Sequence, residues 1–182
     1  TGSLVLSQPT VAPFTKGQME FGLHAASDSD LGLGRSVSAL VIMLGGASVD
    51  ASSTRQHLAS PDSTAAEVTA AGTGLTKLVA ARQWLQNVRV PQAEPSPYYL
   101  DSSSAILLGD SAGAPRRSIW IRRRIDVLTD YAEIGEARYV KVDESDNFSD
   151  GLSKPVKHDT FLRHLAYLDG TLARDAYLSY AA

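Results

Sequence analysis

The sequence predicts one α/β domain, and three observations lead to that prediction. Three segments rich in strand-forming residues follow one another between residues 19 and 56, with turn signals between them. Apolar residues then recur at helical spacing over residues 63–85. From residue 98 to residue 168, strand-like and helix-like segments alternate. A run of strands followed by alternating helices and strands is typical of a mixed sheet covered by helices.

The first three strands are expected to form an antiparallel meander over residues 19–27, 37–44 and 48–56. An acidic, glycine-rich turn that begins at Asp28 separates the first two strands. Gly45 and Gly46 mark the turn before the third strand. Because these connections are short, consecutive strands should pair with each other.

The later elements follow from periodicity and from helix start and stop signals. A short strand over residues 98–100 ends directly in Asp101. The segments after it are predicted to be helices over residues 105–108 and 116–134, a strand over residues 137–142 and a helix over residues 160–168. That last helix is expected to be amphipathic, with apolar residues at Phe161, Leu165 and Leu168.

Length and composition restrict the class of protein. With 182 residues, 43% of them hydrophobic, the chain can bury a core without disulfides. It has no cysteine, so thiolate metal sites are excluded and oxygen atoms are the expected metal ligands. The longest strongly apolar run, residues 39–44, is too short to cross a bilayer, so we expect a soluble protein without a membrane partner. Residues 1–18 are expected to be a lead-in or linker, residues 19–170 the domain, and residues 171–182 a tail.

Acidic side chains stand at the ends of several predicted elements, and four of them are the candidate catalytic and metal-binding residues: Asp28, Glu67, Asp101 and Asp150. Each also has a purely structural alternative. Asp28 and Asp150 could be turn residues, and Asp101 could be a helix N-cap. Glu67 could close a capping box with Thr64. For each acid taken singly, these alternatives stay open.

Taken together, the four acids favour a single site. The strand that ends in Asp101 places this acid at the carboxyl edge of the sheet, where α/β proteins build their sites. Asp28 would be its neighbour if the first strand pairs with that strand. Glu67, on the first helix, and Asp150, before the last helix, could converge on the same place. Two Mg²⁺ ions that hydrolyse a phosphodiester need such oxygen ligands, and without metal four like charges would repel one another.

Six short motifs occur in order along the chain. The first two are D-S-D at residues 28–30 and R-S-V-S-A at residues 35–39, before L-G-G at residues 44–46. The next two are S-S-T-R-Q at residues 52–56 and S-T-A-A-E-V at residues 63–68. The last two are Y-L-D-S-S-S-A-I at residues 99–106 and S-D-G-L-S-K-P at residues 149–155.

These motifs resemble those of the ribonuclease H domain at the C-terminal end of copia-type, Pseudoviridae-like retrotransposon polyproteins. The family motifs are T-D-A-D-W, R-S-T-S-G before L-G-G, S-S-K-K-Q, S-T-E-A-E-Y, Y-C-D-N-Q-S-A-I and A-D-I-L-T-K-P. The resemblance covers roughly residues 23–170. It implies an α/β ribonuclease H-like fold, with a five-stranded mixed sheet whose first three strands are antiparallel, and helices on both faces.

The resemblance also implies an enzyme, a metal-dependent ribonuclease H that cuts the RNA strand of an RNA/DNA hybrid within a reverse transcriptase. The family's four metal-binding acids correspond to Asp28, Glu67, Asp101 and Asp150. They would hold two Mg²⁺ ions, with Mn²⁺ as a substitute, and Asp28 would contact both ions. The expected partners are an RNA/DNA hybrid and a polymerase domain N-terminal to this one in a polyprotein. The expected location is the cytoplasm, including virus-like particles.

The chain departs from the family pattern in three places. Leu31 replaces the tryptophan of the first motif. The family segment K-H-I-D-I-R-Y-H corresponds to residues 119–126, which keep Arg124 and lose both histidines. Residues 142–149 contain no histidine, although ribonucleases H often carry one before the fourth acid. The histidines that the chain has are expected to be structural or surface-exposed: His24, His57, His158 and His164.

A net charge of −3 gives no general attraction for nucleic acid, so binding would need a local basic patch. On a helix over residues 116–134, Arg116, Trp120 and Arg123 or Arg124 share one face that could contact phosphates. The alternative is a solvated basic face with Trp120 in the core. Further candidates for contacts with phosphates or 2′-hydroxyls are Arg117, Ser52 and Ser102.

Two alternative functions remain at this point. A domain of this kind could have lost cutting activity and serve as a nucleic-acid-binding or scaffold module. It could also be another nuclease of the same fold, such as an integrase, a transposase or a junction resolvase. The four retained acids argue against the first alternative. The glutamate on the first helix and the order of the motifs argue against the second.

Overall fold

The computed structural model describes residues 22–32, 34–101 and 119–172. Its strands are β1 (His24–Asp30), β2 (Val37–Leu44), β3 (Ala47–Arg55), β4 (Ser96–Leu100) and β5 (Ala137–Lys141). Its helices are α1 (Ser63–Asn87), α3 (Ile119–Glu133), α4 (Asp150–Ser153) and α5 (His158–Leu168), with a 3-10 turn, η1, at Glu144–Asp146. Outside the described residues lie the predicted lead-in, the predicted helix over residues 105–108, and positions 173–182 of the predicted tail.

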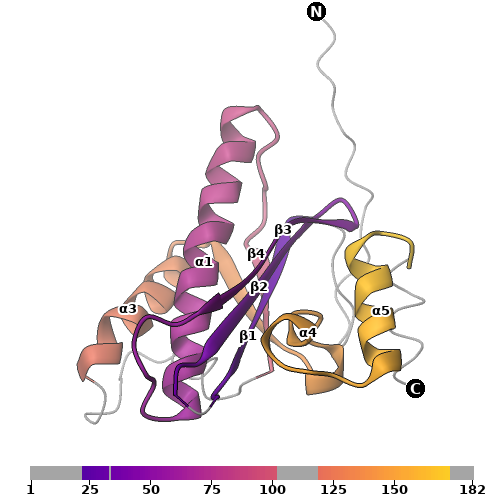
Figure 1. Cartoon of the computed structure of the whole chain (residues 1–182). Coiled ribbons are helices and arrows are strands. Elements are labelled where there is room, and N and C mark those ends of the chain that lie inside the picture. Colours follow the sequence, from indigo (N-terminus) through magenta and orange to yellow (C-terminus); the bar gives the residue numbers. More distant parts are fainter. Residues whose placement is uncertain (1–21, 33, 102–118, 173–182) are drawn as a thin grey trace, which may run out of the picture.

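The five strands form one mixed sheet in the order β3-β2-β1-β4-β5 (Figure 1). β1, β2 and β3 pair antiparallel, as predicted. Gly45 and Gly46 have positive φ angles of 62° and 92°, which the tight turn between β2 and β3 requires and which glycine adopts easily. β4 is parallel to both β1 and β5. The prediction of an α/β fold with a five-stranded mixed sheet is confirmed.

β1 extends further than the sequence predicted. A turn beginning at Asp28 was expected, but the strand continues to Asp30. Asp28 pairs with Ala39, and Asp30 pairs with Val37. The turn preference of aspartate and serine is outweighed by pairing with β2, a strand rich in strand-forming residues. Asp28 is therefore held in a hydrogen-bonded strand and not in a turn.

Helices α1 and α3 cover one face of the sheet (Figure 1). Asp62 begins α1 as its N-cap, and its carboxylate accepts a hydrogen bond from the Ala65 amide at 2.7 Å. The hydroxyl of Tyr98 on β4 donates to the carbonyl of Ala71 at 3.1 Å, which ties the sheet to the middle of α1. The core on this face includes Leu75, Leu78, Ile125 and Leu128.

Helices α4 and α5 lie on the opposite face, so the prediction of helices on both faces is confirmed. Phe148 packs against Tyr167 of α5, with ring centroids 5.2 Å apart. The predicted apolar face of α5 is correct at Leu168, which packs against this core, and wrong at Phe161 and Leu165, which are 43% and 47% exposed while His164 is buried. Polar hydrogen bonds of His164 and Tyr167 to distant segments decide which side of α5 faces the sheet. No helix in the described ranges has the length and apolar character needed to span a membrane.

Candidate metal centre

The parallel pairing of β1 with β4 brings two acids to one edge of the sheet. Ala26 pairs with Tyr99, and each strand places an acid two residues further on, Asp28 and Asp101. The expectation that these acids would be neighbours is confirmed. Lys141 of β5 donates from its ammonium group to the Asp101 carbonyl at 3.0 Å, which fixes the backbone where β4 ends.

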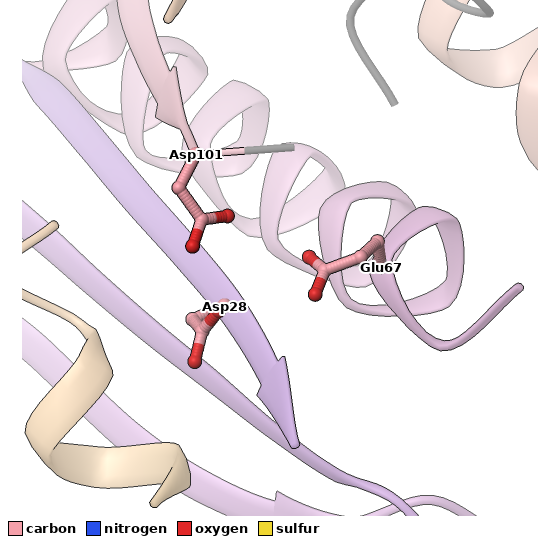
Figure 2. Close-up of side chains that lie close together, drawn as sticks. All are labelled: Asp28, Glu67 and Asp101. Carbon is pink, nitrogen blue, oxygen red and sulfur yellow. The ribbon is translucent and has the colours of Figure 1, made fainter. Parts of the chain in front are cut away.

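Glu67 reaches the same place from α1. Figure 2 shows the carboxylates of Asp28, Glu67 and Asp101 turned toward a common space, each from a different element. Their ligand oxygens lie within 4.8 Å of one another. Asp28 is buried and the other two are half-buried. The alternative role of Glu67 in a capping box is wrong, because Asp62 caps α1.

Asp150 lies beside Asp28 at the start of α4. Asn147 anchors the segment before it, because the Asn147 side-chain amide donates to the Ser27 carbonyl of β1 at 3.2 Å. The side-chain Oδ1 of Asn147 in turn accepts hydrogen bonds from the backbone amide and the hydroxyl of Ser149 at 3.2 and 2.6 Å. Asp150 therefore begins a helix that is tied to the strand carrying Asp28, and it is not a simple turn residue.

Two residues of the site were not identified from the sequence. The Ser153 hydroxyl donates to Oδ2 of Asp28. The Lys154 ammonium lies 3.1 Å from Oδ2 of Asp150 and 3.8 Å from Oδ2 of Asp28. Both belong to the S-K-P motif after Asp150, and their helical spacing from Asp150 was the available signal.

Burial and mutual repulsion disturb the ionisation of these acids. Burial, with the charges of Asp28 and Asp101, raises the pKa of Glu67 to about 8. Burial and the charge of Asp28 raise the pKa of Asp150 to about 7. The same two causes raise the pKa of Asp101. Crowding carboxylates in this way is unfavourable unless a cation balances their charge.

The four acids fit an oxygen-ligated divalent cation. Carboxylate oxygens are the ligands that hard ions such as Mg²⁺ prefer. Oδ1 of Asp150 is buried and has no hydrogen-bond partner within the described ranges, so one ligand atom is not committed to another group. A bound cation would engage that atom and offset the repulsion among the carboxylates.

Solved structures of ribonuclease H1 enzymes share this fold. No protein-family model and no curated protein matches the sequence. The LC11 ribonuclease H1 isolated from compost by a metagenomic approach is similar in structure, with a TM-score of 0.57, 14% identity, and coverage of 72% of this chain and 92% of that chain. Ribonuclease H1 from Halobacterium salinarum NRC-1 gives a TM-score of 0.51, 15% identity, and coverage of 72% and 93%. The chain has a ribonuclease H-like fold.

A second structure of the LC11 enzyme was determined in complex with an RNA/DNA hybrid. Its TM-score to this ribonuclease H-like chain is 0.52, with 11% identity and coverage of 71% of this chain and 92% of that chain. At these identities the similarity establishes the fold, and the chemistry must be argued from the site itself.

The candidate nucleic-acid-binding residues are only partly placed in the ribonuclease H-like domain. Arg123 is exposed, whereas Arg124 is half-buried, and its side chain packs over Gly72 of α1. Ser52 accepts a hydrogen bond from Lys77 at 3.3 Å and, with Arg124, lines a cavity of about 250 Å³. The other candidates lie outside what the structure describes: Arg116, Arg117, Ser102 and the side chain of Trp120.

The histidines of the ribonuclease H-like domain have the structural or surface positions that were expected. The ring of His24 is buried, with Nε2 3.1 Å from the Tyr167 hydroxyl. His164 is also buried, with Nε2 3.1 Å from the Ser145 carbonyl. His57 and His158 are exposed.

The raised pKa values predict how pH affects the stability of the metal-free ribonuclease H-like domain. Glu67 and Asp150 have folded-state pKa values of about 8 and about 7, above their ordinary values of 4.5 and 3.8. At pH values between the ordinary and the folded-state pKa of each acid, the folded state therefore binds more protons than the unfolded state. The stability that comes from protonating these two acids is lost as the pH rises through 7 to 8. In EDTA, the melting temperature should fall between pH 5 and pH 9, and Glu67→Gln should reduce that fall.

Thermal unfolding of both proteins across this pH range, with EDTA and with Mg²⁺, provides the measurement. Mg²⁺ should also reduce the fall in the wild type, because a cation stabilises the ionised carboxylates. Identical pH profiles of wild type and Glu67→Gln would contradict the prediction.

Proposed function

We propose that this protein is a metal-dependent endoribonuclease that cuts the RNA strand of RNA/DNA hybrids. The observation that supports it most is the convergence of Asp28, Glu67 and Asp101 within 4.8 Å at the carboxyl edge of a ribonuclease H-like sheet. Asp150 stands beside Asp28 at the same edge. The structural likeness to an enzyme that was crystallised with a hybrid adds support for this substrate.

The four carboxylates would share the binding of two Mg²⁺ ions, for which Mn²⁺ could substitute. Asp28, Glu67 and Asp101 would hold one ion between β1, α1 and β4. Asp28 and Asp150 would hold the other on the side of α4. Bound Mg²⁺ would supply the positive charge that polarises the scissile phosphate and activates a water for attack. Ser153 orients Asp28 through its hydrogen bond, and Asn147 positions Asp150 through its bond to β1.

A cleavage assay tests the proposal directly. End-labelled RNA/DNA hybrid, duplex DNA and duplex RNA are incubated with the protein and Mg²⁺ or Mn²⁺, beside Asp101→Asn. Only the RNA strand of the hybrid should be cut, and Asp101→Asn should lower the rate by at least about a hundredfold, because it removes a charged metal ligand. Asp126→Asn, the same substitution at an exposed position on α3, should cut at the wild-type rate.

Each alternative function corresponds to a distinct result of that assay. Hybrid that stays uncut with every metal, while the protein still binds it, would favour a nucleic-acid-binding module. Cutting of duplex DNA in preference to the hybrid would favour an integrase, transposase or resolvase. Equal cutting by Asp101→Asn and wild type would contradict the proposed site.

We further infer, from the six motifs alone, that the domain belongs to a copia-type retrotransposon reverse transcriptase. In that setting a polymerase domain precedes it in a polyprotein, and the protein acts in the cytoplasm or in virus-like particles. Sequencing the gene upstream tests this inference. An open reading frame that continues into polymerase motifs would support it, and an unrelated upstream domain would contradict it.

A further inference from the structure

Lys154 places a positive charge against the acids on the α4 side of the site. Its ammonium lies 3.1 Å from Asp150 and 3.8 Å from Asp28. The two carboxylates are almost fully buried, with side-chain exposures of 4% and 1%. A divalent cation bound by Asp28 and Asp150 would have to share these carboxylates with the ammonium or displace it.

The local backbone holds Lys154 in this position. Its amide donates to the Asp150 carbonyl at 3.1 Å, so Lys154 ends the four-residue helix α4 one turn after Asp150. Pro155 follows, and the residue before a proline is restricted to extended backbone, as the φ of −142° and ψ of 158° at Lys154 show. The short segment from Asp150 to Pro155 therefore carries both an acid of the site and the lysine ammonium that faces it.

Glu144 gives the same ammonium a second partner outside the site. Its Oε1 lies 2.9 Å from the Lys154 ammonium, and its side chain is 73% exposed. Burial alone would lower the pKa of Lys154, but the carboxylates of Glu144, Asp28 and Asp150 together raise it. The lysine is thus a charged group placed between a surface acid and two buried acids.

We propose that Lys154 is a positioning residue that competes with a divalent cation for the Asp28–Asp150 side of the centre, and that Glu144 retains the ammonium when that cation binds. This inference rests on the metal centre proposed above. Two classes of cation site follow from it. The site formed by Asp28, Glu67 and Asp101 binds first, and the site shared with Lys154 binds more weakly.

Mn²⁺ binding to the protein without nucleic acid tests the proposal, with unbound Mn²⁺ measured by electron paramagnetic resonance. Lys154→Gln should tighten the weaker site by about tenfold, because the competing charge is removed. Glu144→Gln should weaken it by about threefold, because the ammonium keeps only the buried acids as partners. Lys154→Arg keeps the positive charge and should bind Mn²⁺ as the wild type does.

The decisive result is that the two glutamine variants change the Mn²⁺ affinity of the weaker site in opposite directions. Unchanged Mn²⁺ binding in Lys154→Gln, or weaker binding in both variants, would overturn the proposal. Thermal unfolding confirms that each variant is folded, and Lys154→Met repeats the charge removal if Lys154→Gln does not fold. The binding assay contains no substrate. Changes in Mn²⁺ affinity in the expected directions would therefore support this inference even if the cleavage assay leaves the hybrid uncut.

Discussion

Asp28→Asn is expected to lower hybrid cleavage by at least about a thousandfold and to abolish tight Mn²⁺ binding. Asp28 groups with Glu67 and Asp101, and it shares the Lys154 ammonium with Asp150. Its charge is among the causes that raise the pKa of each of these three acids. Loss of this carboxylate removes the ligand that both cations would share.

The same substitution should make the metal-free protein more stable, because the repulsion among the buried acids decreases. We expect the melting temperature in EDTA to rise by about 2–4 °C, and the stabilisation by Mg²⁺ to disappear. Asp30→Asn, two residues further along β1, is the matched control and should leave cleavage within about threefold of wild type. Activity of Asp28→Asn close to that of Asp30→Asn would contradict the proposed centre.

Gly74→Ala is expected to destabilise the fold by roughly 3 kcal/mol, even though alanine favours helices. A Cβ atom at this position in α1 would collide with the Tyr98 hydroxyl and would lie 2.8 Å from Cδ1 of Leu40. Tyr98 is fully buried, and its hydroxyl bonds to the carbonyl of Ala71, so the ring cannot move aside without breaking that bond. Close packing of α1 on the sheet at this point requires glycine.

Gly72→Ala, two positions earlier on a different face of the same helix, is the matched control. Its added Cβ would lie 3.6 Å from Cβ of Arg124, an ordinary contact. We expect this variant to be as stable as the wild type or up to about 1 kcal/mol more stable, because alanine has the higher helix propensity. Urea unfolding of both variants measures the difference, and a Gly74→Ala protein as stable as Gly72→Ala would contradict the packing argument.

Local signals in the sequence predicted much of the fold. The limits of β2 agree with prediction, because a continuous run of strand-forming residues lies between glycine-containing turns. The start of α1 at Ser63 also agrees, because a proline and capping residues precede its apolar periodicity. The meeting of Asp28 with Asp101 was expected if their two strands paired, and the structure shows this pairing, which is parallel and brings both acids to one edge of the sheet.

The features that the sequence did not reveal depend on contacts between distant segments. Asp28 and its neighbours look like a turn locally, but pairing with β2 makes them a strand. The orientation of α5 depends on His164 meeting Ser145 and Tyr167 meeting His24. Lys154 belongs to the site because α4, a helix of four residues, brings it to Asp28 of β1.

The two edge strands of the sheet also affect self-association. Among the strands that the structure describes, β3 and β5 each have one side without a neighbouring strand, and unpaired backbone groups of this kind can recruit strands from other molecules. β3 is rich in serine and threonine, carries Asp50 and Arg55, and pairs with β2 through an irregular register near Ile42. β5 has only five residues and carries Arg138 and Lys141. Charge, short length and irregularity thus oppose aggregation through either edge during the high-concentration work that metal titrations require.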